Sequence, residues 1–170
     1  MQLPRGLVVV RHAQAEAYAA SDVERELTPN GREDAAEAGR WLAEQGVVPA
    51  TAYVSAAVRT RETWSQMAGA AGWSVTPTYD ELLYSTDEDG ILELLRRTDD
   101  AVGTVVVLGH NPTVAVLAQL LDDGDGPAEI AAELAGGYPT CAVTVFDVAT
   151  SWADLGPMGA TPRAFHVGRG

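Results

Sequence analysis

The sequence is poor in cysteine and contains no lysine. Its one cysteine, Cys141, excludes an internal disulfide framework, and this predicts a reducing compartment. No apolar run approaches the length of a membrane span, and the run that begins at Leu7 is too short for a signal peptide. We therefore expect a cytoplasmic protein without a membrane anchor.

Positive charge is also scarce, because 11 arginines face 24 acidic residues and give a formal net charge of -13. Such a balance argues against nucleic acid and anionic membranes as partners, since both require a basic surface. An anionic substrate would need a local group of cations. Without lysine these must be guanidinium groups, which bind phosphate oxygens through two hydrogen bonds. The oligomeric state cannot be predicted from these features.

The 170 residues suffice for one domain, residues 1–170, with a sizeable core. Apolar or alternating segments alternate with helical patterns, which predicts an α/β fold: a mainly parallel sheet between two helical layers. The expected strands are 7–10, 52–55, 73–76, 104–108 and 141–148, with 151–155 and 163–167 as paired edge strands. The expected helices begin at Thr28 and Thr86 as caps and cover 58–71, 113–121 and 128–134.

Two buried strands of the same type end on histidines. Leu7–Val10 is followed by Arg11 and His12, and the strand at 104–108 is followed by His110. If these strands are parallel neighbours, both histidines lie at the carboxyl edge of the sheet, where open α/β sheets bind ligands. Arg59 begins the helix after the strand that ends at Ser55, so we expect it at the same edge.

Several other chemistries lack their motifs. The sequence contains no GxxxxGK[ST] loop, no GxGxxG and no Gly-x-Ser-x-Gly elbow, so nucleotide binding and serine hydrolysis are unsupported. Two histidines beside arginines, without clustered cysteines or carboxylates, make a poor zinc site. We predict no cofactor and no metal. What remains is phosphoryl chemistry with a neutral imidazole as nucleophile and arginines to carry the phosphoryl charge.

These residues resemble the signature of the histidine phosphatase superfamily, which includes the phosphoglycerate mutases. The matching segments, in the family's order, are Arg11-His12-Ala13, Leu27–Arg32, Val54–Thr63 and Leu108–Pro112. Asp80–Tyr84, Tyr138–Ala142 and the small size resemble the SixA-type phosphohistidine phosphatase branch. The resemblance spans most of the chain and implies a three-layer, phosphoglycerate mutase-like sandwich. Ala13 replaces the glycine of the signature, which leaves open how closely the backbone must approach there.

The resemblance also implies roles for individual residues. His12 would be the nucleophile, Arg11 and Arg59 would bind the phosphoryl oxygens, and His110 would donate a hydrogen bond to them. Asn111 belongs to the last motif and would contact substrate.

Other positions have two interpretations. Arg25 either approaches the phosphate or is a solvated loop charge beside Glu24 and Glu26. Glu81 is either the acid that protonates a leaving oxygen or a loop carboxylate. Arg61 is expected to pair with surface carboxylates.

Three functions are compatible with this pattern. The preferred one is hydrolysis of phosphohistidine on proteins through a phosphohistidine intermediate at His12, since a short chain with no inserted cap would leave the pocket open to a protein side chain. The second is a small-molecule phosphomonoesterase with Glu81 as acid, because an ester leaves as a basic alkoxide and needs a proton. The third is a noncatalytic phospho-binding module, against which the intact nucleophile argues. The predicted partner is thus a phosphorylated protein or a small phosphate.

Overall fold

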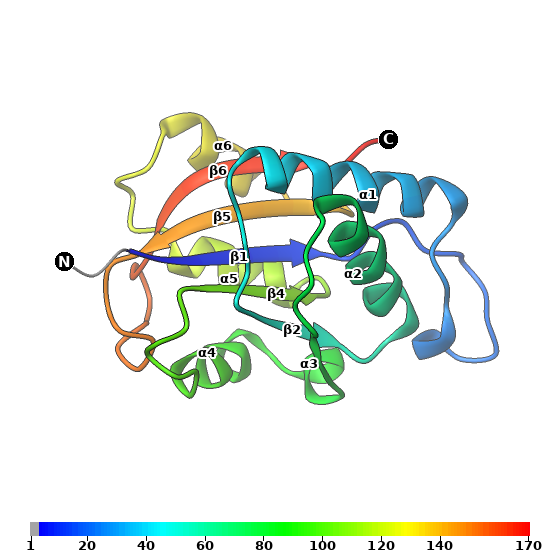
Figure 1. The fold of residues 1–170 in the computed structure, drawn as a ribbon, viewed down its shortest axis with the longest axis horizontal. Coiled ribbons are helices and arrows are strands. Elements are labelled where there is room, and N and C mark those ends of the chain that lie inside the picture. Colours follow the sequence, from blue (N-terminus) through cyan, green and yellow to red (C-terminus); the bar gives the residue numbers. More distant parts are fainter. Residues whose placement is uncertain (1–3) are drawn as a thin grey trace.

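The computed structural model describes residues 4–170. They form a six-stranded sheet in the order β3-β2-β4-β1-β5-β6 (Figure 1). The strands are β1 (Arg5–Arg11), β2 (Thr51–Ser55), β3 (Thr78–Asp80), β4 (Thr104–Gly109), β5 (Ala142–Val148) and β6 (Thr161–Val167). Neighbouring strands of this sheet pair in parallel from β3 to β1, whereas β5 is antiparallel to both β1 and β6. The prediction of a mainly parallel sheet is confirmed.

Helices cover both faces of the sheet. They are η1 (Asp22–Glu24), α1 (Pro29–Glu44), α2 (Val58–Ala71), α3 (Leu82–Ser85), α4 (Glu88–Arg96), α5 (Thr113–Leu121) and α6 (Ala128–Gly136). α1 and α2 pack on one face, in front of the sheet in Figure 1, and α4, α5 and α6 pack on the other. This is the expected three-layer α/β/α sandwich.

The apolar run in β1 is buried on both sides. Leu7 and Val9 belong to the core beneath α4, α5 and α6, while Val8 and Val10 belong to the core beneath α1 and α2. Successive side chains of a strand point to opposite faces, so a strand between two helical layers must be apolar throughout. The polar residues of the segment therefore start where the strand leaves the core, at Arg11.

Two local features fix the position of α1 and α2 on the sheet. The side chain of Thr28 accepts a hydrogen bond from the Gly31 N–H, and Pro29 is the first residue of α1, as predicted. At Gly39 a Cβ atom would lie 2.2 Å from the Met67 carbonyl oxygen, so only glycine lets α1 pack this closely on α2. The position of α2 matters because its first turn carries Arg59.

Some predicted elements are wrong. Residues 73–76 form no strand, because β3 at 78–80 occupies the edge beside β2. Residues 151–155 form a turn, since the Asp154 N–H bonds to the Ser151 carbonyl, and β6 pairs with β5 instead. Thr86 does not cap α4. It ends the unpredicted helix α3, and the side chain of Asp87 accepts the capping bond from the Gly90 N–H.

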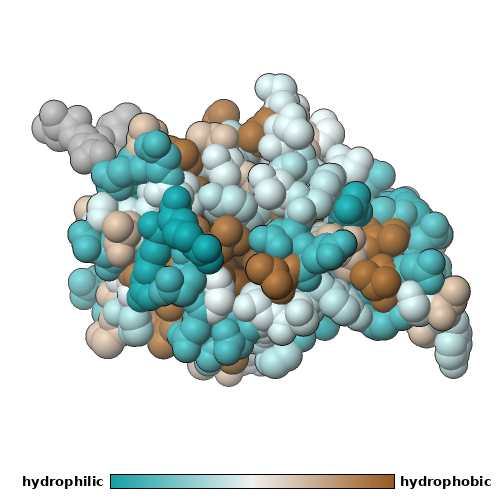
Figure 2. Space-filling view, turned by 90° about the horizontal axis from the view of Figure 1, so that it is seen from below, coloured by the Kyte–Doolittle hydropathy of each residue, from teal (hydrophilic) through white to brown (hydrophobic). Residues whose placement is uncertain are grey.

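The surface is mostly polar. Figure 2 views the molecule from below, where α3 and α4 lie in Figure 1, and hydrophobic side chains there form separate patches among hydrophilic ones. Within residues 4–170, every helix is too short or too polar to span a bilayer.

Candidate active site

The two strand-terminal histidines lie together at the carboxyl edge of the sheet. β1 and β4 are parallel neighbours, with Arg11 opposite Gly109, and the His12 N–H donates to the Gly109 carbonyl. The ring centroids of His12 and His110 are 5.3 Å apart. The convergence that the sequence predicts is confirmed.

His12 is held as a neutral ring with a defined tautomer. It is 8% exposed, and its Nδ1 lies 2.7 Å from the Ala13 carbonyl oxygen. Because a carbonyl only accepts, Nδ1 carries the proton and Nε2 keeps its lone pair. Burial is the main cause that lowers the pKa of His12 to about 4. The bond to the Ala13 carbonyl raises the pKa, and the charges of Arg59, Arg11 and Arg25 lower it. The imidazole is therefore uncharged at neutral pH.

Arg59 is the cation closest to this ring. Its Nε lies 3.4 Å from His12 Nε2, and the side chain is buried although it carries a charge. Nη1 donates to the Asp22 carbonyl at 2.9 Å, and Nη2 pairs with the Asp22 carboxylate at 3.2 Å. The guanidinium lies 5.8 Å from the centre of the Tyr84 ring. Arg59 is thus oriented from several sides toward the two histidines.

Arg61 lies outside the cluster, as the helical spacing predicts. The expectation that it pairs with surface carboxylates is wrong. Its Nε donates to the Ala56 carbonyl at 2.9 Å, and its guanidinium stacks 4.3 Å from the centre of the Tyr79 ring. A backbone acceptor and an aromatic face take the place of the expected carboxylate.

His110 lies beside the same group of cations and is half-buried. Its Nε2 is 2.8 Å from Ser55 Oγ, and the Tyr84 ring packs perpendicular to the imidazole. Burial is the main cause that lowers its pKa to about 3, and the charge of Arg59 is the next. Among residues 4–170 its buried Nδ1 has no hydrogen-bond partner.

Arg11 and Asn111 meet on a single carbonyl. Arg11 Nη1 donates to the Tyr138 carbonyl at 3.0 Å, and Asn111 Nδ2 donates to the same oxygen at 2.8 Å. The Arg11 charge helps to lower the pKa of both histidines, so it acts within the cluster. Its buried Nε has no partner within the described residues. Asn111 uses its amide to hold the segment before β5.

The sequence pointed to Arg25 but missed the carboxylate beside it. Arg25 Nε donates to Asp22 Oδ1 at 2.9 Å, and its Nη1 donates to the Glu16 carbonyl. Tyr84 donates its hydroxyl to Asp22 Oδ2 at 2.5 Å. Arg25 therefore pairs with Asp22 rather than standing free beside Glu24. The i,i+3 spacing of Asp22 and Arg25 was the available signal, whereas nothing local connects Asp22 with Tyr84.

Glu81 lies at the margin of this group. Its exposed side chain borders a hollow of about 380 Å³ lined also by Val23, Ala56, Arg61 and Tyr84. Within residues 4–170 its carboxylate makes no hydrogen bond or ion pair, and its role as an acid stays a prediction. In the same part of the chain, no three His, Cys, Asp or Glu side chains are grouped so that they could hold a metal ion.

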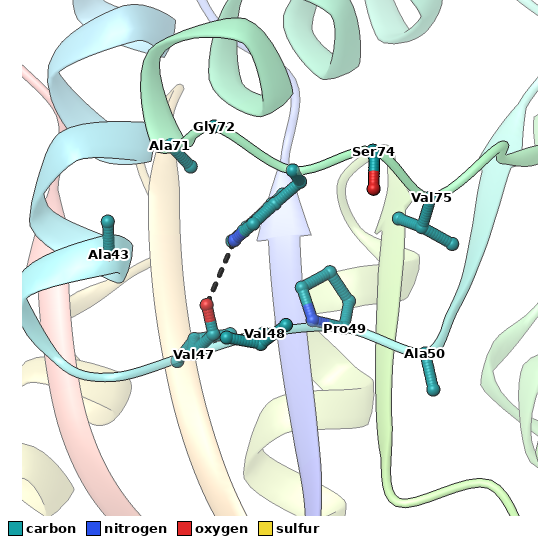
Figure 3. A pocket seen from close by; sticks show the side chains of 10 residues that line it. Ala43, Val47, Val48, Pro49, Ala50, Ala71, Gly72, Ser74 and Val75 are labelled. Atoms are coloured by element: carbon teal, nitrogen blue, oxygen red, sulfur yellow. Dashed lines mark hydrogen bonds between the residues drawn. The ribbon is translucent and has the colours of Figure 1, made fainter.

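A second hollow, of about 420 Å³, lies at the opposite, amino end of β2. Figure 3 shows Val47, Val48, Pro49 and Val75 around it, and a dashed line for the bond from the Trp73 indole N–H to the Val47 carbonyl, 2.9 Å long. Its lining contains no acid, base or cation, so it offers nothing for phosphoryl chemistry. The chemically equipped site is the one at the carboxyl edge.

The chain was compared with protein families and with curated proteins. A model of the histidine phosphatase superfamily (branch 1) matches residues 7–90. An uncharacterized protein of Mycobacterium tuberculosis is 35% identical over 165 residues, which cover 94% of this chain and all of the relative. Phosphohistidine phosphatase SixA of Escherichia coli is 29% identical over 124 residues, covering 70% of this chain and 75% of that protein.

Solved structures agree with this assignment. A Nakamurella multipartitia protein, proposed to be phosphohistidine phosphatase SixA, superimposes with a TM-score of 0.85 at 29% identity, and the match covers 98% of each chain. The family model, the near-complete relatives and the shared fold together show that this chain belongs to the histidine phosphatase superfamily, as a phosphatase of the SixA type.

Proposed function

We propose that the protein hydrolyses phosphohistidine on other proteins through a covalent phosphohistidine at His12. One observation carries this proposal. The Ala13 carbonyl holds the proton of His12 on Nδ1, so the lone pair of Nε2 faces the Arg59 guanidinium, 3.4 Å away. A neutral imidazole beside a phosphate-binding cation is the arrangement that attack on phosphorus needs.

The reaction has two transfers. The Nε2 lone pair of His12 forms a bond to phosphorus, and the bond from phosphorus to the substrate nitrogen breaks, with its electron pair going to the substrate ring. Water then attacks the phosphoryl group, the bond to Nε2 breaks, and phosphate leaves. Arg59 and Arg11 neutralise the phosphoryl oxygens throughout, which is the main contribution a protein makes to such transfers.

His110 supplies a further donor in this proposal. Ser55 Oγ accepts from the Ala57 N–H, and its own proton is free to go to His110 Nε2. The ring proton of His110 then lies on Nδ1, the buried nitrogen without a partner among residues 4–170. Nδ1–H of His110 and Nε–H of Arg11 would together bind two phosphoryl oxygens.

The choice of phosphohistidine over an ester rests on the leaving group. A departing alkoxide needs an acid, and within residues 4–170 the exposed Glu81 carboxylate makes no hydrogen bond to either histidine. An imidazole protonated on its other nitrogen instead leaves as a neutral ring. The rim residues Asp22 and Tyr84 are exposed, which leaves the cluster open to a protein side chain. The likeness to phosphohistidine phosphatase SixA of Escherichia coli supports the same choice.

The test compares two substrates. A phosphohistidine peptide and phenyl phosphate are offered in parallel to the wild type and to His12→Ala, in the presence of a chelator. We expect phosphate release from the peptide, much slower release from the ester, and loss of both in the variant. Faster ester turnover would make the protein a phosphomonoesterase. Phosphate binding without turnover of either substrate would instead support a phospho-binding module.

A further inference from the structure

The Asp22 carboxylate opposes phosphate binding at the proposed site. Its Oδ1 accepts from Arg25 Nε at 2.9 Å, and its Oδ2 accepts from Arg59 Nη2 at 3.2 Å and from the Tyr84 hydroxyl at 2.5 Å. A negative group thus lies against Arg59, a proposed phosphate-binding guanidinium, and against Arg25. A phosphate dianion that approaches Arg59 meets this charge at close range, and like charges repel.

Asp22 stays ionised and open to solvent. The Tyr84 hydroxyl, followed by Arg25 and Arg59, lowers the pKa of Asp22 to about 2. It therefore cannot donate a proton to a leaving group near neutral pH. Its side chain is 53% exposed, whereas that of Arg59 is 6% exposed. His12 lies buried within the cluster, and Asp22 lies at its exposed rim. A protein substrate would approach the cluster from the Asp22 side, and the substrate's imidazole would leave on the same side.

We infer that Asp22 is a specificity residue, which binds the ring N–H of a phosphohistidine substrate and disfavours phosphate esters. This rests on the proposed function and adds a residue to it. A phosphohistidine ring protonated on its second nitrogen carries a positive charge, and the Asp22 carboxylate accepts that N–H. When the P–N bond breaks, the electron pair returns to the ring nitrogen and the ring leaves neutral. An alkoxide offers Asp22 no proton and gains negative charge as it leaves.

Tyr84 positions this carboxylate. Its hydroxyl donates to Asp22, its ring packs perpendicular to that of His110 at 5.5 Å between centroids, and its face lies toward Arg59. Tyr84 comes from α3 and Asp22 from η1, so the bond connects two sides of the rim. The Tyr84 hydroxyl and Arg59 both bond to Oδ2, whereas Oδ1, within the described residues, accepts only from Arg25 and can accept a further hydrogen bond from a substrate.

The test is the ratio of two rates in Asp22→Asn. We expect kcat/KM for a phosphohistidine peptide to fall about 10- to 100-fold, as expected for loss of a charge-assisted hydrogen bond. For phenyl phosphate we expect kcat/KM to rise, because the repulsion at Arg59 is removed. Glu24→Gln, a carboxylate on the same turn that bonds to Ser21, is the matched control and should change neither rate.

Three outcomes separate the possibilities. Opposite changes for the two substrates support the assignment. If kcat/KM rises equally for both substrates, Asp22 merely competes with phosphate for the arginines. If kcat/KM falls equally for both, Asp22 only maintains the fold of the rim. Either result overturns the assignment. Acid-labile phosphate on His12 is measured in the same variant. If the wild type itself neither turns over the peptide nor acquires this label, the proposed function fails, independently of Asp22.

Discussion

The two ends of the sheet contrast sharply. At the amino end of β2 the chain leaves a hollow of about 420 Å³, lined by valines, Pro49 and alanines. At the carboxyl ends of β1 and β4 it concentrates two neutral histidines and the buried guanidinium of Arg59. Cavity size alone would direct attention to the first. Buried charge is costly without a use or a partner, and this favours the second end as the proposed active site.

The largest difference between the two ends should appear with His12→Asn. Removal of the nucleophile should lower turnover of a phosphohistidine peptide by at least about 10⁴-fold, as for other covalent catalysts. His166→Asn is the matched control, because His166 pairs with Glu37 and stacks on Trp41, away from the cluster. Steady-state rates measure both. A His12 variant that retains more than a hundredth of the activity would contradict the proposed role.

Arg59→Ala should have the next largest effect. Loss of the guanidinium beside Nε2 should lower kcat by about 10²- to 10³-fold, the range found when one donor to a transition-state oxyanion is lost. Arg61→Ala, two residues along the same helix, removes a charge that bonds to Ala56 and Tyr79 and should leave kcat near the wild-type value. Equal losses in the two variants would mean that overall charge, not position, is responsible.

The buried histidines should make stability depend on pH. The pKa of His12 falls from 6.5 to about 4 on folding, so between these values the unfolded chain binds more protons and the free energy of unfolding falls as pH falls. From pH 7 to pH 5 the expected loss from His12 is about 2 kcal/mol. Urea unfolding of the wild type and His12→Asn at both pH values measures it. An identical loss in the variant would show that His12 is not the source.

The smallest effect should come from the hollow at the amino end. Trp73→Phe removes the indole N–H that bonds to the Val47 carbonyl, and should lower the free energy of unfolding by about 1 kcal/mol. Turnover should not change, since the hollow contains no group for phosphoryl transfer. Urea unfolding and steady-state kinetics test the two parts separately. Lower kcat with unchanged stability would show that the two ends of the sheet are coupled.

The features that the sequence predicted correctly are those encoded by a few consecutive residues. The apolar runs before His12 and His110, and the Thr28 cap followed by Pro29, are properties of a few consecutive residues, and the structure confirms them. The convergence of the histidines needed one further assumption, that the two strands are parallel neighbours. The general rules for α/β sheets supplied it.

The missed features depend on contacts between distant segments. Asp22 and Tyr84 are 62 residues apart, and neither lies in a motif that indicates the other. The strand expected at 73–76 fails for a similar reason, because strand formation requires a free neighbouring edge and β3 occupies it. The strand propensity of a segment does not determine which of two nearby segments pairs with the edge of β2.

The most direct test of the proposed role of His12 is to capture the phosphoryl group during turnover. The protein is mixed with a phosphohistidine peptide, quenched in base within a fraction of a turnover, and mapped by mass spectrometry of its own peptides. We expect an acid-labile phosphoryl group on the peptide that contains His12, and none there in His12→Asn. Release of phosphate by an enzyme that never carries this group, or carries it on His110, would contradict the proposal.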